Sequence, residues 1–226
     1  MKGFLIIIGI ASLMLNDVHK SYAQTVKAKK KQELFFGMGP TAYKGDLSDG
    51  FNKWSMSMHL GIKFNRWNKI NGNFLLTIGS VTGQNVGYAF DDGNLPSPSP
   101  NRFFKTNIAS INYEVHYNFI NKEKLKVYAS QGIGILRFQP QDEFGAGLVD
   151  QVFTRAVNET YGNITLILPT QLGVQYTLPN EYSVGVQVGF TNTLSDYIDN
   201  ISSWSSSSGQ DNIFSYRFQV YIPVRY

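Results

Sequence analysis

The chain contains no cysteine among its 226 residues, so disulfides and cysteine-based metal sites are excluded. Charged residues are also scarce, at 16% of the chain, whereas aromatic residues reach 14%. No stretch approaches the roughly 18 consecutive apolar residues that a membrane-spanning helix needs. Neither a disulfide-stapled fold nor a helical membrane protein is therefore expected.

The first 23 residues have the pattern of a secretory signal peptide. Lys2 supplies a positive start, Phe4–Leu15 is a short apolar run, and Ser21-Tyr22-Ala23 is a small-residue cleavage site before Gln24. A run of about a dozen apolar residues is too short to cross a bilayer as a helix. We expect residues 1–23 to be removed on export.

The formal net charge of +4 is modest, and much of the surplus lies in residues 24–32, which contain Lys27, Lys29, Lys30 and Lys31. A nucleic-acid-binding protein would need a basic face across its fold, and no such distribution follows this cluster. We interpret residues 24–32 as a basic, solvated leader before the first strand. Contact with acidic lipid headgroups or a periplasmic partner is the alternative.

The last fourteen residues, Ile213–Tyr226, alternate in polarity. Every second residue from Phe214 to Tyr226 is apolar or aromatic. A period of two places successive side chains on opposite faces of a β-strand. A long strand that ends on an aromatic residue is typical of the closing strand of an outer-membrane β-barrel.

Seven further alternating segments precede the closing strand. They span Glu33–Tyr43, Trp54–Phe64, Asn73–Thr82, Lys105–Phe119, Lys124–Phe138, Asn163–Thr177 and Tyr182–Thr191. Short turns and long loops connect them in alternation, which is the layout of bacterial outer-membrane barrels. We expect residues 33–226 to form an all-β, eight-stranded antiparallel transmembrane barrel with both termini in the periplasm.

Alternation alone does not say which face of the barrel points outward. A soluble eight-stranded barrel such as a lipocalin would show its polar face to water. Such a face usually carries about a quarter charged residues, but here it is mainly Ser, Thr, Gln, Asn and Gly. Aromatic residues also gather near the segment ends, as interfacial girdles require: Trp54, Phe64, Tyr117, Phe119, Tyr176, Tyr182, Phe190, Phe214 and Tyr226. These features favour the membrane barrel.

Eight strands leave an interior only wide enough for side chains, so a pore is not expected. The predicted inward face still holds ionisable residues, namely His59, Lys63, Glu114, His116 and Arg217. Buried ionisable groups are costly unless they are paired. We therefore predict a polar network that ties adjacent strands together, with Glu114 facing a cationic neighbour.

Glu114 and His116 share a face, and with a serine they would form a hydrolase set like that of outer-membrane lipid deacylases. The predicted fourth strand, however, descends from an outer loop to a short turn, which places His116 near the periplasmic rim. Outer-leaflet lipids lie at the opposite rim, and no serine partner follows from the sequence. We expect no catalytic residues and no cofactor.

Two acidic pairs lie in the predicted outer loops: Asp46 with Asp49, and Asp196 with Asp199. Clustered carboxylates can bind Ca²⁺, but the ligand count and glycine spacing of a dedicated calcium loop are missing. Aspartates in turns commonly accept hydrogen bonds from their own backbone. Turn chemistry is therefore predicted here, and no metal site.

Three motifs resemble those of a known family. Tyr43-Lys44-Gly45-Asp46-Leu47 is similar to a Y-x-G-D-L opening, and Tyr128–Gly134 to a Y-x-x-x-G-I-G fifth strand. Phe190–Asn200, which contains Asp196, Tyr197 and Asp199, resembles a T-D-Y-(L/I)-D-(D/N) signature. Together they resemble the PorG-like small outer-membrane barrels of Bacteroidetes, which are linked to type IX secretion and gliding motility.

This resemblance implies a non-enzymatic outer-membrane component of the secretion apparatus. Its implied partners are outer-membrane lipid and a periplasmic ring of lipoprotein and partner protein. The alternative is a general small barrel that supports envelope integrity or binds ligands through its outer loops. A lipid-modifying enzyme is the third possibility.

Overall fold

The computed structural model describes residues 31–48, 50–65, 67–87, 102–152, 161–201 and 211–224. The expected signal peptide, Asp49 and the terminal Tyr226 lie outside these ranges, as does the leader up to residue 30. Within the described residues, no helix is long and apolar enough to cross a membrane.

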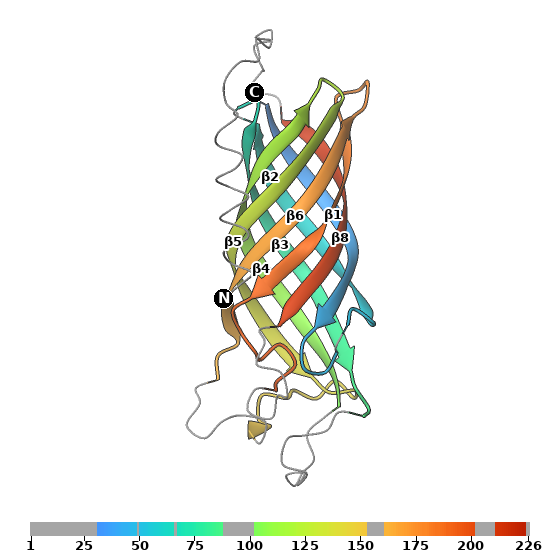
Figure 1. Ribbon diagram of the computed structural model, residues 1–226, viewed down its shortest axis with the longest axis vertical. Coiled ribbons are helices and arrows are strands. Elements are labelled where there is room, and N and C mark those ends of the chain that lie inside the picture. Colours follow the sequence, from blue (N-terminus) through green and yellow to red (C-terminus); the bar gives the residue numbers. More distant parts are fainter. Residues whose placement is uncertain are drawn as a thin grey trace.

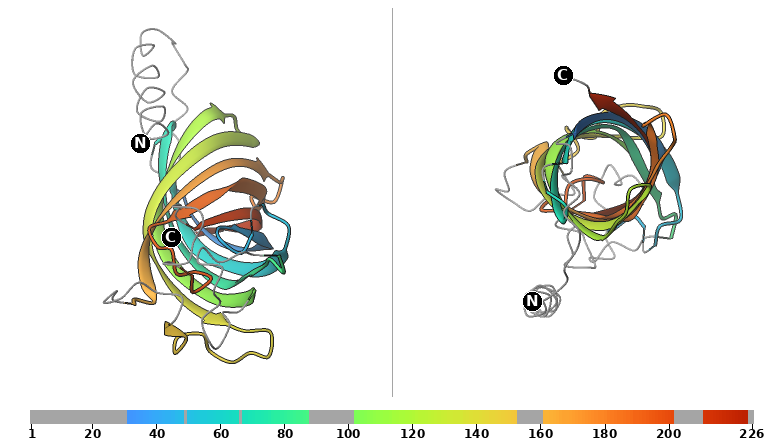
Figure 2. Two further views of the ribbon diagram at one scale, coloured as in Figure 1. Left: turned by 60° about the horizontal axis from the view of Figure 1, so that its bottom comes forward. Right: turned by 90° about the horizontal axis from the view of Figure 1, so that it is seen from above.

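The described chain folds into a closed barrel of eight antiparallel strands (Figure 1). Their bounds are β1 Lys31–Lys44, β2 Trp54–Asn65, β3 Ile70–Gln84, β4 Phe103–Asn121, β5 Leu125–Gln141, β6 Ile164–Thr177, β7 Ser183–Thr193 and β8 Asn212–Val224. Each strand pairs with its neighbours in the chain, and β1 pairs with β8 to complete the ring seen end-on in Figure 2. The predicted fold class is confirmed.

The main difference from the sequence-based bounds is strand length. β3 begins at Ile70 rather than Asn73, and β4 begins at Phe103 and continues to Asn121. The reason is their mutual pairing, which continues from Ile70 opposite Tyr117 to Gln84 opposite Phe103. Long-range pairing thus extends the strands beyond the residues whose alternation is clear.

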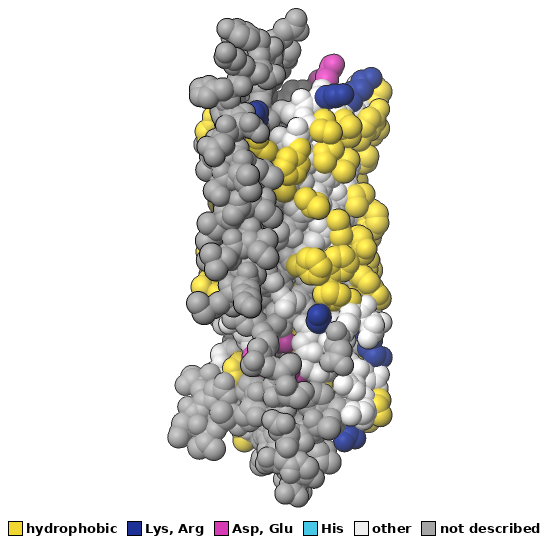
Figure 3. Space-filling model, viewed as in Figure 1, with side chains coloured by type: hydrophobic (Ala, Val, Ile, Leu, Met, Phe, Trp, Pro, Cys, Tyr) yellow, Lys and Arg dark blue, Asp and Glu magenta, His cyan; other side chains and the backbone are white. Residues whose placement is uncertain are grey.

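The apolar face of the wall points outward. In β2, for example, Leu60 is 54% exposed while its neighbour His59 is buried. Figure 3 shows apolar side chains over the visible part of the wall between the two ends of the barrel. Large exposed apolar surfaces of this kind are stable against lipid and not against water. The soluble-barrel alternative is therefore wrong.

The two ends of the barrel differ. The turn rim carries the short β2–β3, β4–β5 and β6–β7 connections together with the start of β1 and the end of β8. The loop rim carries the longer β1–β2, β3–β4, β5–β6 and β7–β8 connections, which lie at the bottom of Figure 1. Aromatic rings cluster outside the loop rim, where Phe214 lies 4.9 Å from Phe190 and 6.1 Å from Trp54 between centroids.

Inward-facing glycines explain why the fifth predicted segment alternates weakly. Gly132 and Gly134 of β5 face the interior, opposite Glu114 and Asn112 of β4. A Cβ at Gly132 would lie 2.9 Å from Glu114 Cγ, and one at Gly134 would overlap Asn112. The missing side chains make room for the larger polar groups of β4.

The outward apolar face leads to a first prediction. Leu60→Arg, in the middle of β2, should destabilise the barrel in lipid vesicles by about 2–4 kcal/mol, because a charge near the bilayer midplane loses its hydration. Trp67→Arg, in the β2–β3 turn, should cost only about 0–1 kcal/mol near the interface. Urea unfolding in vesicles measures both, and equal effects would contradict a lipid-facing wall.

Candidate functional site

The interior of the barrel holds a charged centre at Glu114. Its carboxylate accepts hydrogen bonds from Arg217 Nη1 at 2.8 Å and from Asn112 Nδ2 at 3.0 Å. His116 Nε2 lies 3.4 Å from the second carboxylate oxygen. Arg217 comes from β8 and the other three residues from β4, and all are buried. Glu114 thus faces the cationic neighbour that was predicted for it.

A second polar group lies nearer the turn rim, around Lys63. Its ammonium donates to Gln175 Oε1 at 2.6 Å and lies 4.5 Å from the ring centroid of Tyr128. Gln175 in turn donates to Glu33 at 3.2 Å, and Tyr221 is the second ring near the ammonium. Lys63 is fully buried, so these contacts and the cation–π interactions replace its hydration.

His59 lies apart from both groups. Its two ring nitrogens each lie 3.0 Å from a hydroxyl, that of Ser57 and that of Thr77. A cavity of about 30 Å³ adjoins His59 and Arg217, which leaves room for a few water molecules at most. The described lumen is therefore filled by side chains, as eight strands imply.

The geometry does not assemble the hydrolase set that the sequence raised. Strand pairing places Ser130 opposite His116, so a serine is present that sequence reasoning missed. Neither His116 Nδ1 nor Ser130 Oγ has a hydrogen-bond partner in the structure, and both residues are buried. The His116 ring instead stacks on Tyr128 at 4.5 Å. The general base is thus not joined to a nucleophile.

At the loop rim, the two loop motifs meet. The Tyr43 hydroxyl contacts Asp199 Oδ2 at 2.9 Å and also contacts Asp211 Oδ1. Asp199 Oδ2 accepts a further hydrogen bond from the Leu47 amide at 3.2 Å. The β1–β2 loop and the β7–β8 loop are therefore fastened to each other, although about 150 residues separate them in the chain.

The remaining motif residues support this junction. Gly45 forms a tight turn with Ser48, and a side chain there would collide with Tyr43 and Asp211. Asp46 is buried in the same loop, and Tyr197 packs against the apolar cluster of the rim. Asp196 adds its negative charge near Asp211. All seven singled-out loop residues thus belong to one region.

The prediction of local turn chemistry for Asp199 is incomplete. The Asp199 side chain does accept from the Ile201 amide two residues on, at 3.0 Å. It also bonds across the rim, because the β1–β2 loop folds against it. Asp211, which sequence reasoning missed, accepts from the Ile198 amide at 2.8 Å. No local pattern marks Asp211, since its partners come from other segments.

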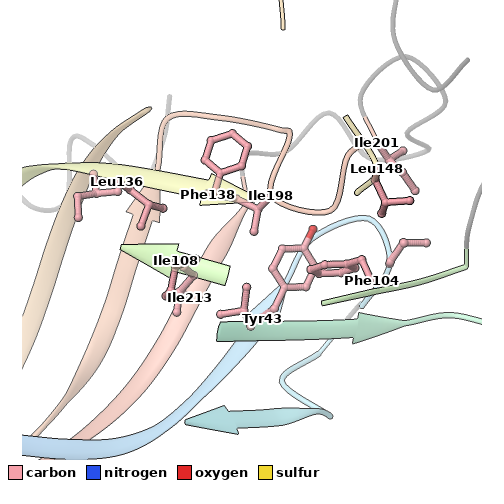
Figure 4. Close-up of a cluster of buried hydrophobic side chains, with 12 residues drawn as sticks. Tyr43, Phe104, Ile108, Leu136, Phe138, Leu148, Ile198, Ile201 and Ile213 are labelled. Atoms are coloured by element: carbon pink, nitrogen blue, oxygen red, sulfur yellow. The ribbon is translucent and has the colours of Figure 1, made fainter. Parts of the chain in front are cut away.

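An apolar layer lies beneath these polar contacts and closes the loop rim. Leu47, Leu148, Ile198 and Ile201 of the loops pack with residues from the strand ends (Figure 4). Tyr43 meets Phe104 edge-on, with ring centroids 4.7 Å apart.

Burial raises the pKa of the Asp199 carboxyl, and the charge of Asp46 raises it further. Hydrogen bonds from Ile201, Tyr43 and Leu47 act in the opposite direction. Burial also raises the pKa of Asp211 well above its usual value, with added repulsion from Asp199. Among the described residues, no group of three or more His, Asp or Glu side chains could hold a metal ion.

The turn rim, in contrast, is hollow. A basin of about 520 Å³ is lined by polar, charged and apolar residues of the turns and the adjoining strand ends: Glu33, Asn65, Trp67, Asn68, Asn71, Asn121, Glu123, Lys124, Lys126, Thr177, Leu178, Pro179, Glu181 and Pro223. Trp67 is 65% exposed beside it. Asn71 is buried, and its Oδ1 has no hydrogen-bond partner in the structure. We call this the turn-rim basin.

Comparisons with known proteins show the fold and no more. No protein-family model and no curated protein matches this chain. Among solved structures, Neisserial surface protein A is similar, with 12% identity, a TM-score of 0.52, and coverage of 84% of this chain and 96% of that one. The attachment invasion locus protein Ail of Yersinia pestis is 9% identical, with a TM-score of 0.49 and coverage of 87% of this chain and 99% of that one. The chain therefore has the fold of an eight-stranded outer-membrane β-barrel.

The Glu114–Arg217 pair leads to a second prediction. Arg217→Met should destabilise the barrel by about 3–5 kcal/mol, because it leaves the Glu114 carboxylate buried without its cation. Adding Glu114→Gln to Arg217→Met should restore most of the stability, because the uncompensated charge is then gone. Urea unfolding of the single and double variants in vesicles checks both, and a double variant no better than the single one would count against the pair.

Proposed function

We propose that this chain is a non-catalytic outer-membrane subunit of a type IX secretion and gliding apparatus in a Bacteroidetes cell. It anchors a periplasmic ring component, such as a lipoprotein, at the outer membrane. In this proposal the turn rim and both termini face the periplasm, and the loop rim faces outside the cell.

The turn-rim basin is the observation that carries the proposal. It combines an exposed indole at Trp67, a turn proline at Pro179 and a buried acceptor at Asn71 that the barrel itself does not satisfy. Aromatic anchors beside desolvated polar groups are typical of protein-binding surfaces. A periplasmic protein could fill this recess without entering the membrane.

The rest of the molecule supports a docking role over a transport role. The lumen is packed around the Glu114 and Lys63 groups, and the apolar layer closes the loop rim. The motifs that resemble the PorG-like family supply the contacts of that closure, from Tyr43 to Asp199. One end is therefore closed and the other is recessed, which suits an anchor for a periplasmic assembly.

Orientation gives a third prediction, made simple by the absence of cysteine. In intact cells a membrane-impermeant maleimide should label Phe144→Cys, because Phe144 lies in the β5–β6 loop and is 87% exposed. It should label Trp67→Cys only after the outer membrane is made permeable. Labelling of Trp67→Cys alone in intact cells would reverse the proposed orientation.

Docking gives a fourth prediction. Deleting the gene should impair secretion of proteins that carry the type IX sorting domain, and normal secretion would contradict the proposal.

Trp67→Ala should weaken co-purification of the periplasmic component by about tenfold or more, as expected when an aromatic anchor worth about 2 kcal/mol is lost. Phe144→Ala, which removes an exposed aromatic ring from the other rim, is the matched control and should change nothing.

One observation favours a second candidate function. The β5–β6 loop presents Phe144, Val149 and Val152 to solvent beyond the loop rim. An exposed apolar group of this kind suits ligand binding by outer loops or a general role in envelope integrity. If Phe144→Ala alone gives a phenotype, this alternative replaces the docking role. A lipid-modifying activity comes third, because His116 and Ser130 are not joined.

A further inference from the structure

The contacts of Tyr43 require a shared proton. Its hydroxyl oxygen contacts a carboxylate oxygen of Asp199 and one of Asp211, but the hydroxyl carries a single hydrogen. It can donate to one of them only. The other contact would bring two unprotonated oxygens together unless that aspartate is itself protonated and donates to the tyrosine. At least one carboxyl in the closed rim therefore holds a proton.

The neighbouring amides indicate which aspartate holds it. Asp199 accepts amide hydrogen bonds on both oxygens, from Leu47 on Oδ2 and from Ile201 on Oδ1. Asp211 accepts an amide hydrogen bond, from Ile198, on Oδ2, which leaves Oδ1 facing Tyr43. Donated hydrogen bonds favour the ionised form. The proton belongs on Asp211 Oδ1, with Tyr43 donating in turn to Asp199.

We propose that this proton is a latch: while Asp211 holds it, the described loop residues 45–48 and 194–201 stay packed against each other at the loop rim, and its loss releases them. Release breaks the chain of contacts from Asp211 through Tyr43 to Asp199 and Leu47. It then uncovers the apolar layer of the loop rim to the outside. The latch is independent of the turn-rim basin and of the proposed secretion role.

The surroundings of the latch add negative charge to the pair. The carboxylates that raise the pKa values of the pair are Asp46 from the β1–β2 loop and Asp196 from the β7–β8 loop. The apolar cluster of the loop rim, which comes from the strand ends and from the β1–β2, β5–β6 and β7–β8 loops, packs around Tyr43. A second negative charge at this place is therefore unfavourable while the rim is closed.

The sign of the pH dependence follows from the raised pKa values. In the open rim, each carboxyl returns to its usual pKa near 3.8. In the closed rim, Asp211 keeps its proton to a much higher pH. The closed state is thus most stable below about pH 4, and it loses stability as pH rises toward the raised value. One retained proton gives about a tenfold fall in the closing constant per pH unit over that window.

Hydrogen exchange of the wild-type barrel in lipid tests the latch. The amides of Leu47, Ile198 and Ile201 donate to the two aspartates, so they report closure directly. Their protection, measured relative to the intrinsic exchange rate at each pH, should fall by at least about tenfold per pH unit as pH rises from about 6 toward the raised pKa of Asp211. The amide of Leu75, in the middle of β3, is the control and should show no such fall. Protection that is independent of pH would overturn the proposal.

Two matched variants test where the proton lies. In Asp211→Asn, the side-chain amide can donate to Tyr43 and its oxygen can still accept from Ile198, so the rim should stay closed. Protection in this variant should lose the factor of about ten per pH unit that the Asp211 proton contributes to the wild-type pH dependence. In Asp199→Asn, the side-chain NH₂ group must face the backbone amide of either Leu47 or Ile201. Two donors then face each other, so the protection of these amides should fall at least tenfold at pH 6. Equal behaviour of the two variants would overturn the assignment. A loss of wild-type protection on chelation with EDTA would show that a cation, and not a proton, holds the rim.

Discussion

The pairing of β1 with β8 is the constraint on which the rest of the structure depends. A bilayer offers no water to peptide groups, so every strand needs a partner on both sides, and only a closed ring supplies one. Closure with eight strands leaves a narrow interior. Successive side chains of a strand point to opposite faces, so an apolar outer face, as at Leu60, goes with a polar inner face. Lipid outside and a packed lumen inside are two results of one closure.

The narrow interior governs how its charges are handled. Glu114 has a guanidinium at hydrogen-bond distance, and Lys63 has an amide oxygen and two aromatic rings. Because these groups are held by residues from strands far apart in the chain, they also tie opposite sides of the barrel together. Such a centre stabilises the barrel.

The loop rim and the turn rim of the barrel have different structures. At the loop rim, Tyr43, Asp199 and Asp211 join described residues of two loops next to an apolar layer. At the turn rim, the described short connections surround the turn-rim basin, and Trp67 is exposed beside it. The two ends of the barrel therefore differ in how they are built.

The sequence by itself determined the strands, their alternation, the outward face and the inward residues such as Glu114 and Arg217, because a period of two is a local property. It also marked both loop motifs. Only the tertiary structure decided that Arg217 of β8 reaches Glu114 of β4, or that Tyr43 joins Asp199 and the unmarked Asp211. These contacts depend on register and barrel closure, which join residues that no local pattern relates.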